Sequence, residues 1–320
     1  SSLNGSRMPR IGVAQLFDDN ADALDLQWIS GSRDSAPSLD SADVNQSSQG
    51  LIGHLNLVHP NWIQIFSRTE AAYFSGLNEQ AQREALERIT GSGLVCIILS
   101  DGEQAPPSLA DFGTASNVPV IASPLASLQV IWVMRTYLGR ALAEFVTRHG
   151  VLLDVLGMGV LLTGESGVGK SELALELISR GSGLVADDVV ELYHIGPSTL
   201  EGRSPQLLKD FLEVRGLGML NIRTIFGETA VRRRKNLKLI VQLEKPVGGN
   251  IPGVERLPLN ASVERILDVD IRTVQLPVAA GRNLAVLVEA AVRNYVLQLR
   301  GIDSTQEFIQ RQEGYLGSQE

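Results

Sequence analysis

Eight consecutive residues near the middle of the chain, Gly164–Ser171, combine three glycines with a lysine and a serine at a fixed spacing. They fit the pattern G-x-x-x-x-G-K-[ST], in which glycines let backbone N–H groups approach phosphate oxygens. Lys170 can reach the β- and γ-phosphates, and the Ser171 hydroxyl can ligate Mg²⁺. The residues expected to bind a nucleotide are therefore Gly164, Glu165, Ser166, Gly167, Val168, Gly169, Lys170 and Ser171.

The residues on either side of this loop favour the strand–loop–helix setting that it requires. An apolar run of strand length, 159–163, precedes it. The segment 172–180 is rich in good helix formers and ends at Gly181. This order places bound phosphates at a helix N-terminus, where free N–H groups and the helix dipole favour anions. A glycine-rich surface loop without a ligand is the alternative.

Two adjacent carboxylates, Asp187 and Asp188, interrupt the next apolar run, 183–190. A carboxylate near a γ-phosphate can hold Mg²⁺ or accept a proton from an attacking hydroxyl. Because side chains alternate along a strand, we expect the two to point to opposite faces, with at most one toward the phosphates unless the strand ends or bulges there. An Asx turn at the end of a strand is the alternative.

A second acidic position lies in the segment LEVRGLG, residues 212–218. Glu213 and Arg215 are two residues apart and share a face if the segment is extended. An acid and a guanidinium on one face can bind a metal ion and the phosphates that it bridges. A surface ion pair is the alternative. The basic run 232–235 could meet an anion or form a solvated turn.

A third candidate segment, LPVAAGRN at 276–283, precedes the long apolar stretch 284–299. Gly281 and Asn283 fit the start of a helix, with Asn283 as N-cap. Arg282 could bind a phosphate there, or the segment could be the ordinary start of a helix.

The amino-acid composition and net charge exclude some classes of protein. The chain has 320 residues, 44% hydrophobic and 20% charged, with a net charge of −8. This charge provides no positive field for a nucleic acid, so we expect no nucleic-acid partner. No run approaches the ~18–20 apolar residues of a membrane span, so we expect no membrane partner. The one cysteine, Cys96, lies in an apolar run and suits a buried thiol in a reducing cytoplasm.

The pattern of segments predicts an α/β fold in two domains, 8–130 and 136–320. The first is a small α/β domain, to which we assign a regulatory or assembly role, and the second carries the phosphate-binding loop. We expect a helix over 125–148 to join them, a mobile Ser/Asp-rich loop between Gly31 and Gly50, and an amphipathic helix at 305–313 that packs on another surface. His54 and His59 lack further ligands and read as strand or turn residues.

Together these segments resemble the HPr kinase/phosphorylase family. The enzymes of this family phosphorylate and dephosphorylate a serine of HPr, the phosphocarrier protein of the bacterial sugar phosphotransferase system. The resemblance covers residues 149 to about 301 and implies a P-loop kinase domain, with weaker likeness at 54–66. It is carried by His149-Gly150, by GVLLTGESGVGKSELALELISRG (159–181) with ADD (186–188), by LEVRGLGMLNIRTIFG (212–227) and by LPVAAGRN (276–283).

The resemblance implies a role for each matching residue. Lys170 would contact the phosphates of ATP, and Ser171 and Glu213 would ligate Mg²⁺. Asp188 would take the serine proton during phosphorylation and return one during dephosphorylation. The other implied residues are His149 near the phosphates, Arg256 at the transferring phosphoryl group, residues 212–221 for both reactions and Pro277 to Arg282 mainly for dephosphorylation.

The family also implies that pyrophosphate can replace ATP as donor, that the reverse reaction consumes phosphate and yields pyrophosphate, and that the enzyme is a homohexamer. The physical chemistry agrees, since serine is a poor nucleophile at neutral pH and benefits from a carboxylate base. Two other functions fit the nucleotide site alone: a kinase of a small metabolite, and a nucleotide-sensing switch. The Asp187-Asp188 pair with LEVRGLG favours the HPr enzyme.

Overall fold

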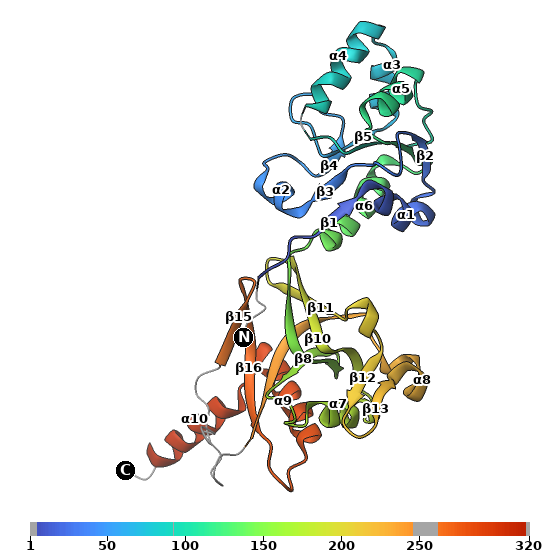
Figure 1. The fold of residues 1–320 in the computed structure, drawn as a ribbon. Helices are drawn as coiled ribbons and strands as arrows, with labels where there is room; N and C mark the ends of the chain where they lie inside the picture. The colour runs from blue at the N-terminus through green and yellow to red at the C-terminus, as the bar shows by residue number, and fades with distance from the viewer. Residues whose placement is uncertain (1–4, 92, 246–261, 318–320) are drawn as a thin grey trace. The chain divides into compact units, whose positions relative to one another are not determined.

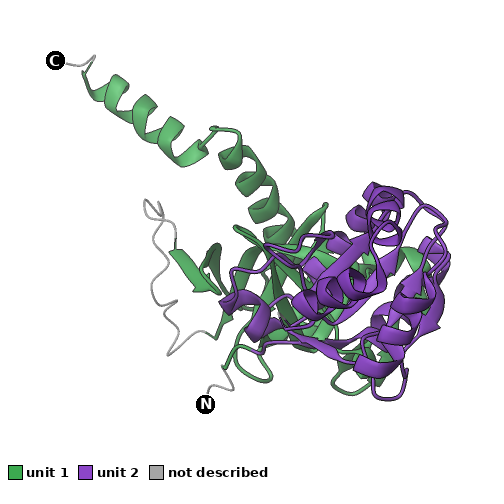
Figure 2. Ribbon diagram, turned by 90° about the horizontal axis from the view of Figure 1, so that it is seen from above, with its two compact units in different colours: residues 1–6, 145–320 green, residues 7–144 purple. Residues whose placement is uncertain are grey.

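The computed structural model describes residues 5–91, 93–245 and 262–317, and it divides into two compact units. One unit is Arg7–Glu144, and the other holds Gly5, Ser6 and the described residues from Phe145 onward (Figures 1 and 2). Among the described residues, no helix is both long and apolar enough to cross a membrane.

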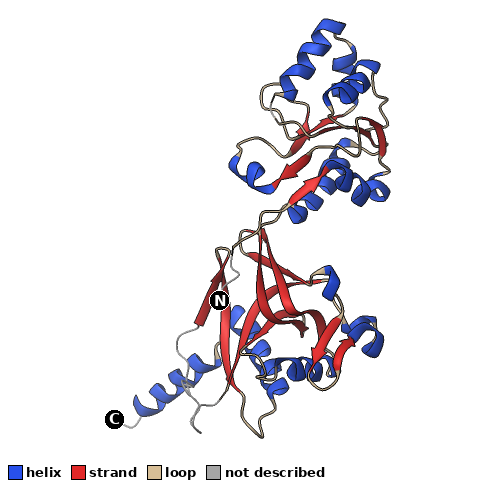
Figure 3. Cartoon of the chain, viewed as in Figure 1, coloured by secondary structure: helices blue, strands red, loops and turns tan. Residues whose placement is uncertain are grey.

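The unit Arg7–Glu144 is an α/β layer structure around a five-stranded sheet of order β2-β7-β6-β5-β4 (Figure 3). Strands β4 to β7 are parallel, and β2 is antiparallel to β7. A separate antiparallel pair joins β1 and β3. The elements are β1 (Arg10–Gly12), α1 (Val13–Leu24), β2 (Gln27–Ser30), β3 (Ser38–Asp40), α2 (Ser41–Gln46), β4 (Ile52–His54), β5 (Ile63–Phe66), α3 (Arg68–Ser75), α4 (Glu79–Thr90), β6 (Cys96–Leu99), α5 (Pro107–Ser116), β7 (Val120–Ala122) and α6 (Ser127–Ala141).

Helices cover both faces of this sheet because the central strands carry apolar side chains on both sides, with the buried Gln64 of β5 as a polar exception. Ile63 and Ile65 of β5 pack with helices α1 and α6, and Phe66 packs with α3, α4 and α5 on the other side. Cys96 is fully buried within β6, and burial raises the pKa of its thiol to about 12. This unit therefore has its own two-sided core.

The prediction of a mobile loop between Gly31 and Gly50 is wrong. Strand β3 and helix α2 lie in that segment. Leu39 is fully buried in the core, Asp40 accepts the Ala42 N–H as N-cap of α2, and Ser41 donates a 2.6 Å hydrogen bond to the Leu142 carbonyl. The polar composition concealed one buried leucine and a helix cap, which together order the segment.

The second unit is built on a seven-stranded sheet of order β11-β10-β8-β9-β14-β16-β15. Strand β14 is parallel to β9 and to β16, and the remaining pairs are antiparallel. The elements are β8 (Phe145–Val155), β9 (Met158–Thr163), α7 (Lys170–Ser179), β10 (Gly183–Gly196), β11 (Thr199–Arg203), η1 (Gln206–Leu208), β12 (Phe211–Val214), β13 (Gly218–Asn221), α8 (Ile222–Phe226), η2 (Glu228–Ala230), β14 (Arg234–Glu244), β15 (Ser262–Ile266), β16 (Val269–Pro277), α9 (Leu284–Leu299) and α10 (Ser304–Gly317).

The two faces of this sheet are covered differently. Helices α7 and α9 and the β12–β13 hairpin pack on one face. On the other face the strands pack on one another, because β11 pairs with both β10 and β14 and curls that end of the sheet toward closure. The phosphate-binding loop connects β9 to α7 on the helix-covered side.

Two further expectations are corrected here. The predicted helix over 125–148 ends at Ala141, and Phe145 begins β8, which places Arg148, His149 and Gly150 inside a strand. The tail helix α10 is longer than the predicted 305–313, and it has no buried residue among those described.

Candidate functional site

The loop at 164–171 has the backbone of a phosphate cradle. Gly164, Gly167 and Gly169 have φ values of 143°, 77° and 105°, which are favoured by glycine. A Cβ on Gly164 would lie 2.7 Å from the Leu243 carbonyl oxygen, so the close packing of the loop on β14 also requires glycine. Helix α7 begins at Lys170, so its free N–H groups face the cradle.

Lys170 lies over the loop itself. Its Nζ donates to the carbonyl oxygens of Gly164 and Glu165, at 2.7 and 3.0 Å. Burial lowers the pKa of Lys170, while the negative charges of Asp187 and Asp188 act in the opposite direction. The ammonium group is thus held by the loop itself, where it could bind an arriving phosphate.

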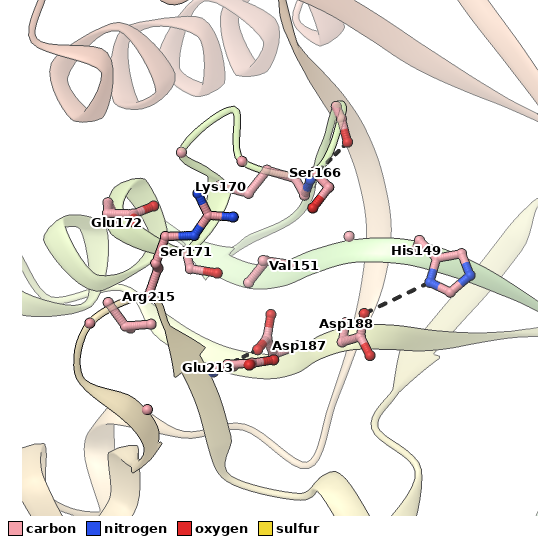
Figure 4. Close-up of a pocket in the computed structure, with 17 residues that line it drawn as sticks. His149, Val151, Ser166, Lys170, Ser171, Glu172, Asp187, Asp188, Glu213 and Arg215 are labelled. Carbon is pink, nitrogen blue, oxygen red and sulfur yellow. Dashed lines mark hydrogen bonds and ion pairs between the residues drawn. The ribbon is translucent and has the colours of Figure 1, made fainter.

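His149 and Asp188 lie on the adjacent strands β8 and β10 (Figure 4). His149 Nδ1 is 3.9 Å from Asp188 Oδ1, and the two side chains are 76% and 69% exposed. The backbone at Asp188 is left-handed, with φ of 65°, and it pairs with Gly150, whose φ is 154°. Both groups are therefore accessible from solvent at a point where the strand pair departs from regular geometry.

This departure explains how both neighbouring aspartates reach one cavity. Asp187 is buried to 7% exposure and Asp188 is exposed, but both line the same cavity. Side chains that alternate along a regular strand could not both face one cavity unless the strand ended or bulged there. In β10 the left-handed backbone of Asp188 provides this break in regular strand geometry. Burial raises the pKa of Asp187, while N–H groups of Glu213 and Asp188 that bond to the carboxylate lower it.

Glu213 and Arg215 come from the β12–β13 hairpin. Leu212 and Val214 are buried in the core, so the alternation of the strand presents Glu213 on the other side. Asp187 Oδ2 accepts the Glu213 N–H at 2.8 Å. The Arg215 guanidinium lies beside the loop, with its nitrogens 3.7 Å from where a Cβ on Gly167 would stand.

These groups surround one cavity of about 630 Å³. Most of the site residues predicted from the sequence line it, and it also contains residues that the sequence analysis did not assign. The predicted ones are His149, Gly164, Ser166, Gly167, Gly169, Lys170, Ser171, Asp187, Asp188, Glu213 and Arg215, with Val214, Gly216 and Gly218 from the implied segment 212–221; the additional ones are Gly150, Val151 and Glu172. Glu172 could have been found, because an acid in the first turn after such a loop must lie beside the phosphates.

Other predicted residues lie apart from this lining. Glu165 and Val168 belong to the loop, but Val168 packs into the core. Arg256 lies outside the described residues. Pro277 ends β16, Gly281 has φ of 83°, and Arg282 precedes Asn283, which caps α9 as predicted. Among the described residues that line the cavity, Pro277, Gly281 and Arg282 are not found.

The segment Pro277–Arg282 nevertheless shares an edge of the sheet with the loop. Strands β9, β14 and β16 are parallel and adjacent in that order, so their carboxyl ends lie along one edge. The loop leaves β9 at Thr163, and the segment leaves β16 two strands away, at roughly 10 Å by the usual strand spacing. The basic run 232–235 has a structural use instead, since Arg232 and Lys235 pair with Asp154 at 3.1 and 3.3 Å.

The loop, the sheet and the convergent charged groups define a P-loop protein with a kinase-like site. Family models described as "HPr Serine kinase N terminus" and "HPr Serine kinase C-terminal domain" match residues 11–138 and 140–312. The chain belongs to the HPr kinase/phosphorylase family, whose members are enzymes. Its two units correspond to the two halves that these models describe.

Two similar proteins agree with this assignment. Proteins named HPr kinase/phosphorylase from Nitrosomonas europaea and Chromobacterium violaceum are 61% and 51% identical to this chain. The matches cover 96% and 98% of this chain, and 95% and 98% of the relatives. A solved structure described as the Hpr(Ser) kinase/phosphatase from Coxiella burnetii is 37% identical over 51% of this chain and 98% of its own, with a TM-score of 0.45.

Proposed function

We propose that this protein transfers a phosphoryl group from ATP or pyrophosphate to a serine of HPr, and that it also removes that group with inorganic phosphate to release pyrophosphate. The observation that carries the proposal is the convergence of a phosphate cradle, Lys170, Asp188 and Glu213 on one cavity. Nucleotide binding alone needs the cradle, whereas transfer to a hydroxyl also needs a base and a site for a cation.

The donor atoms present fit Mg²⁺. Ser171 supplies a hydroxyl and Glu213 an exposed carboxylate, and both line the cavity. Mg²⁺ takes oxygen ligands and keeps several from water and phosphates, so it needs few protein ligands. Among the described residues no group of three or more His, Cys, Asp or Glu could hold a metal, so the phosphates would complete the coordination. The cation would neutralise phosphate charge during transfer.

Asp188 is the base in this proposal. Its carboxylate is 69% exposed and therefore open to a serine carried by a second protein. It accepts the serine proton as the hydroxyl attacks the γ-phosphoryl group, and it returns a proton to the serine when phosphate attacks the phosphoserine. Microscopic reversibility requires one group for both directions. His149 Nδ1 is 3.9 Å from Asp188 Oδ1 and would stabilise the carboxylate when the imidazole is protonated. The family resemblance assigns His149 a place near the phosphates.

The cationic groups of the site are proposed to bind the phosphates. Lys170 bonds to the loop and Arg215 lies beside Gly167, so both would bind phosphates in the cradle. Arg256 is assigned to the transferring phosphoryl group by family resemblance. The segment Pro277–Arg282, on the same edge of the sheet, is assigned mainly to the dephosphorylation reaction.

The proposal includes assembly and location. We infer a homohexamer in the cytoplasm, with domain 8–130 serving regulation or assembly of the catalytic domain 136–320. The surface of α10 supports self-association, because Phe308 and Leu316 are 54% and 61% exposed and the helix has no buried residue among those described. Light scattering of the purified protein measures the state directly, and a stable monomer would contradict it.

A two-way assay on purified HPr tests the function. One arm adds ATP and Mg²⁺ and looks for phosphoserine by mass shift, with HPr lacking the acceptor serine as control. The other arm adds inorganic phosphate to phosphoserine-HPr and looks for pyrophosphate. Activity in both arms supports the proposal. Transfer in the first arm alone would remove the phosphorylase activity and the assigned role of Pro277–Arg282. The absence of both phosphoserine and pyrophosphate would favour a metabolite kinase or a nucleotide switch.

A further inference from the structure

Asp187 is the buried member of the four carboxylates that line the cavity, the others being Glu172, Asp188 and Glu213. It is 7% exposed, whereas Asp188 and Glu213 are exposed. A charge held away from water beside two others of the same sign is costly unless hydrogen bonds compensate. The bonds that this carboxylate accepts therefore indicate what it does.

Both bonds come from the backbone of neighbouring site residues. Asp187 Oδ2 accepts the Glu213 N–H at 2.8 Å, and the Asp188 N–H also bonds to this carboxylate. The first bond connects two different sheets, since β10 belongs to the seven-stranded sheet and β12 pairs only with β13 among the described strands. Figure 4 shows Asp187 and Glu213 in contact below Ser171.

The bond also determines the direction of the Glu213 side chain. Leu212 and Val214 are fixed in the core, and a hydrogen bond to the N–H between them prevents β12 from rotating or shifting along its axis. The Glu213 carboxylate then stays on the cavity side, on the same side as Ser171. Without this acceptor, the N–H would be left unbonded beside the cavity, and β12 would lose its hydrogen bond to β10.

We propose that Asp187 is a positioning residue that holds Glu213 in place to bind the cation, through the backbone bond rather than through its charge. This deepens the proposed function, because it takes Glu213 as a Mg²⁺ ligand. Partners of metal ligands typically change metal affinity by about 10- to 100-fold when they are removed. We expect the lower end of that range, because Glu213 keeps its own carboxylate.

Substitutions at Asp187 distinguish a role of the backbone hydrogen bond from a role of the negative charge. Asp187→Asn keeps an oxygen that can accept the Glu213 N–H but removes the charge, and Asp187→Ala removes both. Asp187→Val replaces the alanine variant if that one does not fold, because valine suits a strand and fills the space of the carboxylate without offering an acceptor. Asp154→Asn is the matched control, since Asp154 is also a buried aspartate on a strand of this sheet, accepts the Gly157 N–H, and does not line the cavity.

Two measurements follow on the full-length protein. Hydrogen–deuterium exchange of the peptide containing Glu213, without metal, reports the backbone bond. Binding of Mn²⁺ alone, followed by its EPR signal, reports the cation site. We expect Asp187→Ala to speed exchange and to weaken Mn²⁺ binding about tenfold. Asp187→Asn should stay within about threefold of the wild-type affinity, and Asp154→Asn should change neither quantity.

A variant without the ligand itself keeps this inference distinct from the proposed function. Glu213→Gln should weaken Mn²⁺ binding at least as much as Asp187→Ala; if it has no effect, the assigned cation site fails. If Glu213→Gln weakens binding and Asp187→Ala changes neither exchange nor affinity, the positioning role fails. If Asp187→Asn is as defective as Asp187→Ala, the charge is the essential property and the backbone bond is not.

Discussion

Replacement of Gly150 by alanine should damage both the stability and the activity of the second unit. Gly150 lies on β8 opposite Asp188, with φ of 154°, and its Cβ would stand 2.4 Å from the Leu162 carbonyl oxygen of β9. Atoms cannot approach so closely, so β8 must move away from β9 or shift against β10. Either movement changes the backbone that holds Asp188.

The cost can be estimated from two contributions. A non-glycine residue at positive φ costs about 1 kcal/mol, and forcing a group into filled space costs about 1–3 kcal/mol. Gly150→Ala should therefore lower the free energy of unfolding by about 3 kcal/mol. For a domain of this size, each kcal/mol corresponds to about 2–4 °C in melting temperature, so we expect a fall of about 6–12 °C.

Gly157 provides the control. It lies in the turn between β8 and β9 with φ of 86°, and no heavy atom lies within 4 Å of its Cβ position. Gly157→Ala therefore has the positive-φ cost without the clash, and it should lower the melting temperature by about 2–4 °C. Calorimetry of the three proteins gives these values, and phosphoryl transfer is then compared at a temperature where all are folded. Equal melting temperatures for the two variants, or full transfer by Gly150→Ala, would refute the steric argument.

Three other outcomes are expected. Asp188→Asn should lose transfer in both directions while ATP still binds, because asparagine tolerates the left-handed backbone but cannot accept the serine proton. Calorimetric titration with ATP and the two-way HPr assay measure binding and transfer separately. Full kinase activity would remove Asp188 from the mechanism. Lys170→Ala should abolish ATP-dependent transfer, measured as phosphoserine on HPr, and retained transfer would mean that the loop is not the donor site. Burial raises the pKa of Cys96 from an ordinary value of 9.0 to about 12, so the folded protein loses stability as pH rises from about 9 to 12, where only the unfolded chain ionises. Denaturant titrations of Cys96→Ala should therefore show a smaller loss of stability over this pH range than the wild type. An equal loss would contradict the burial argument.

The sequence predicted the phosphate-binding loop and its surroundings because their determinants are local. A glycine spacing, an apolar strand and a run of helix formers lie within about two dozen residues, and the structure places β9 and α7 there. Local preference failed where distant pairing decides the conformation. Residues 145–148 continue a helical pattern, but they pair with 190–193 of β10, so tertiary context overrides propensity.

The convergence of the acidic groups could not be derived from the sequence by itself. Alternation along β10 would separate Asp187 from Asp188, and the structure avoids this because Asp188 adopts a left-handed φ opposite Gly150. Aspartate is among the few residues that tolerate this conformation, but nothing in its neighbours along the chain marks it. Such deviations persist where the surrounding structure enforces them, and here two partners do: the β8–β9 packing at Gly150, and the Asp187 carboxylate that bonds to the Asp188 N–H. The position of the proposed base therefore depends on residues whose role shows only after the strands are paired, and for this reason Gly150 and Asp187, rather than the loop, are the sensitive tests of the site.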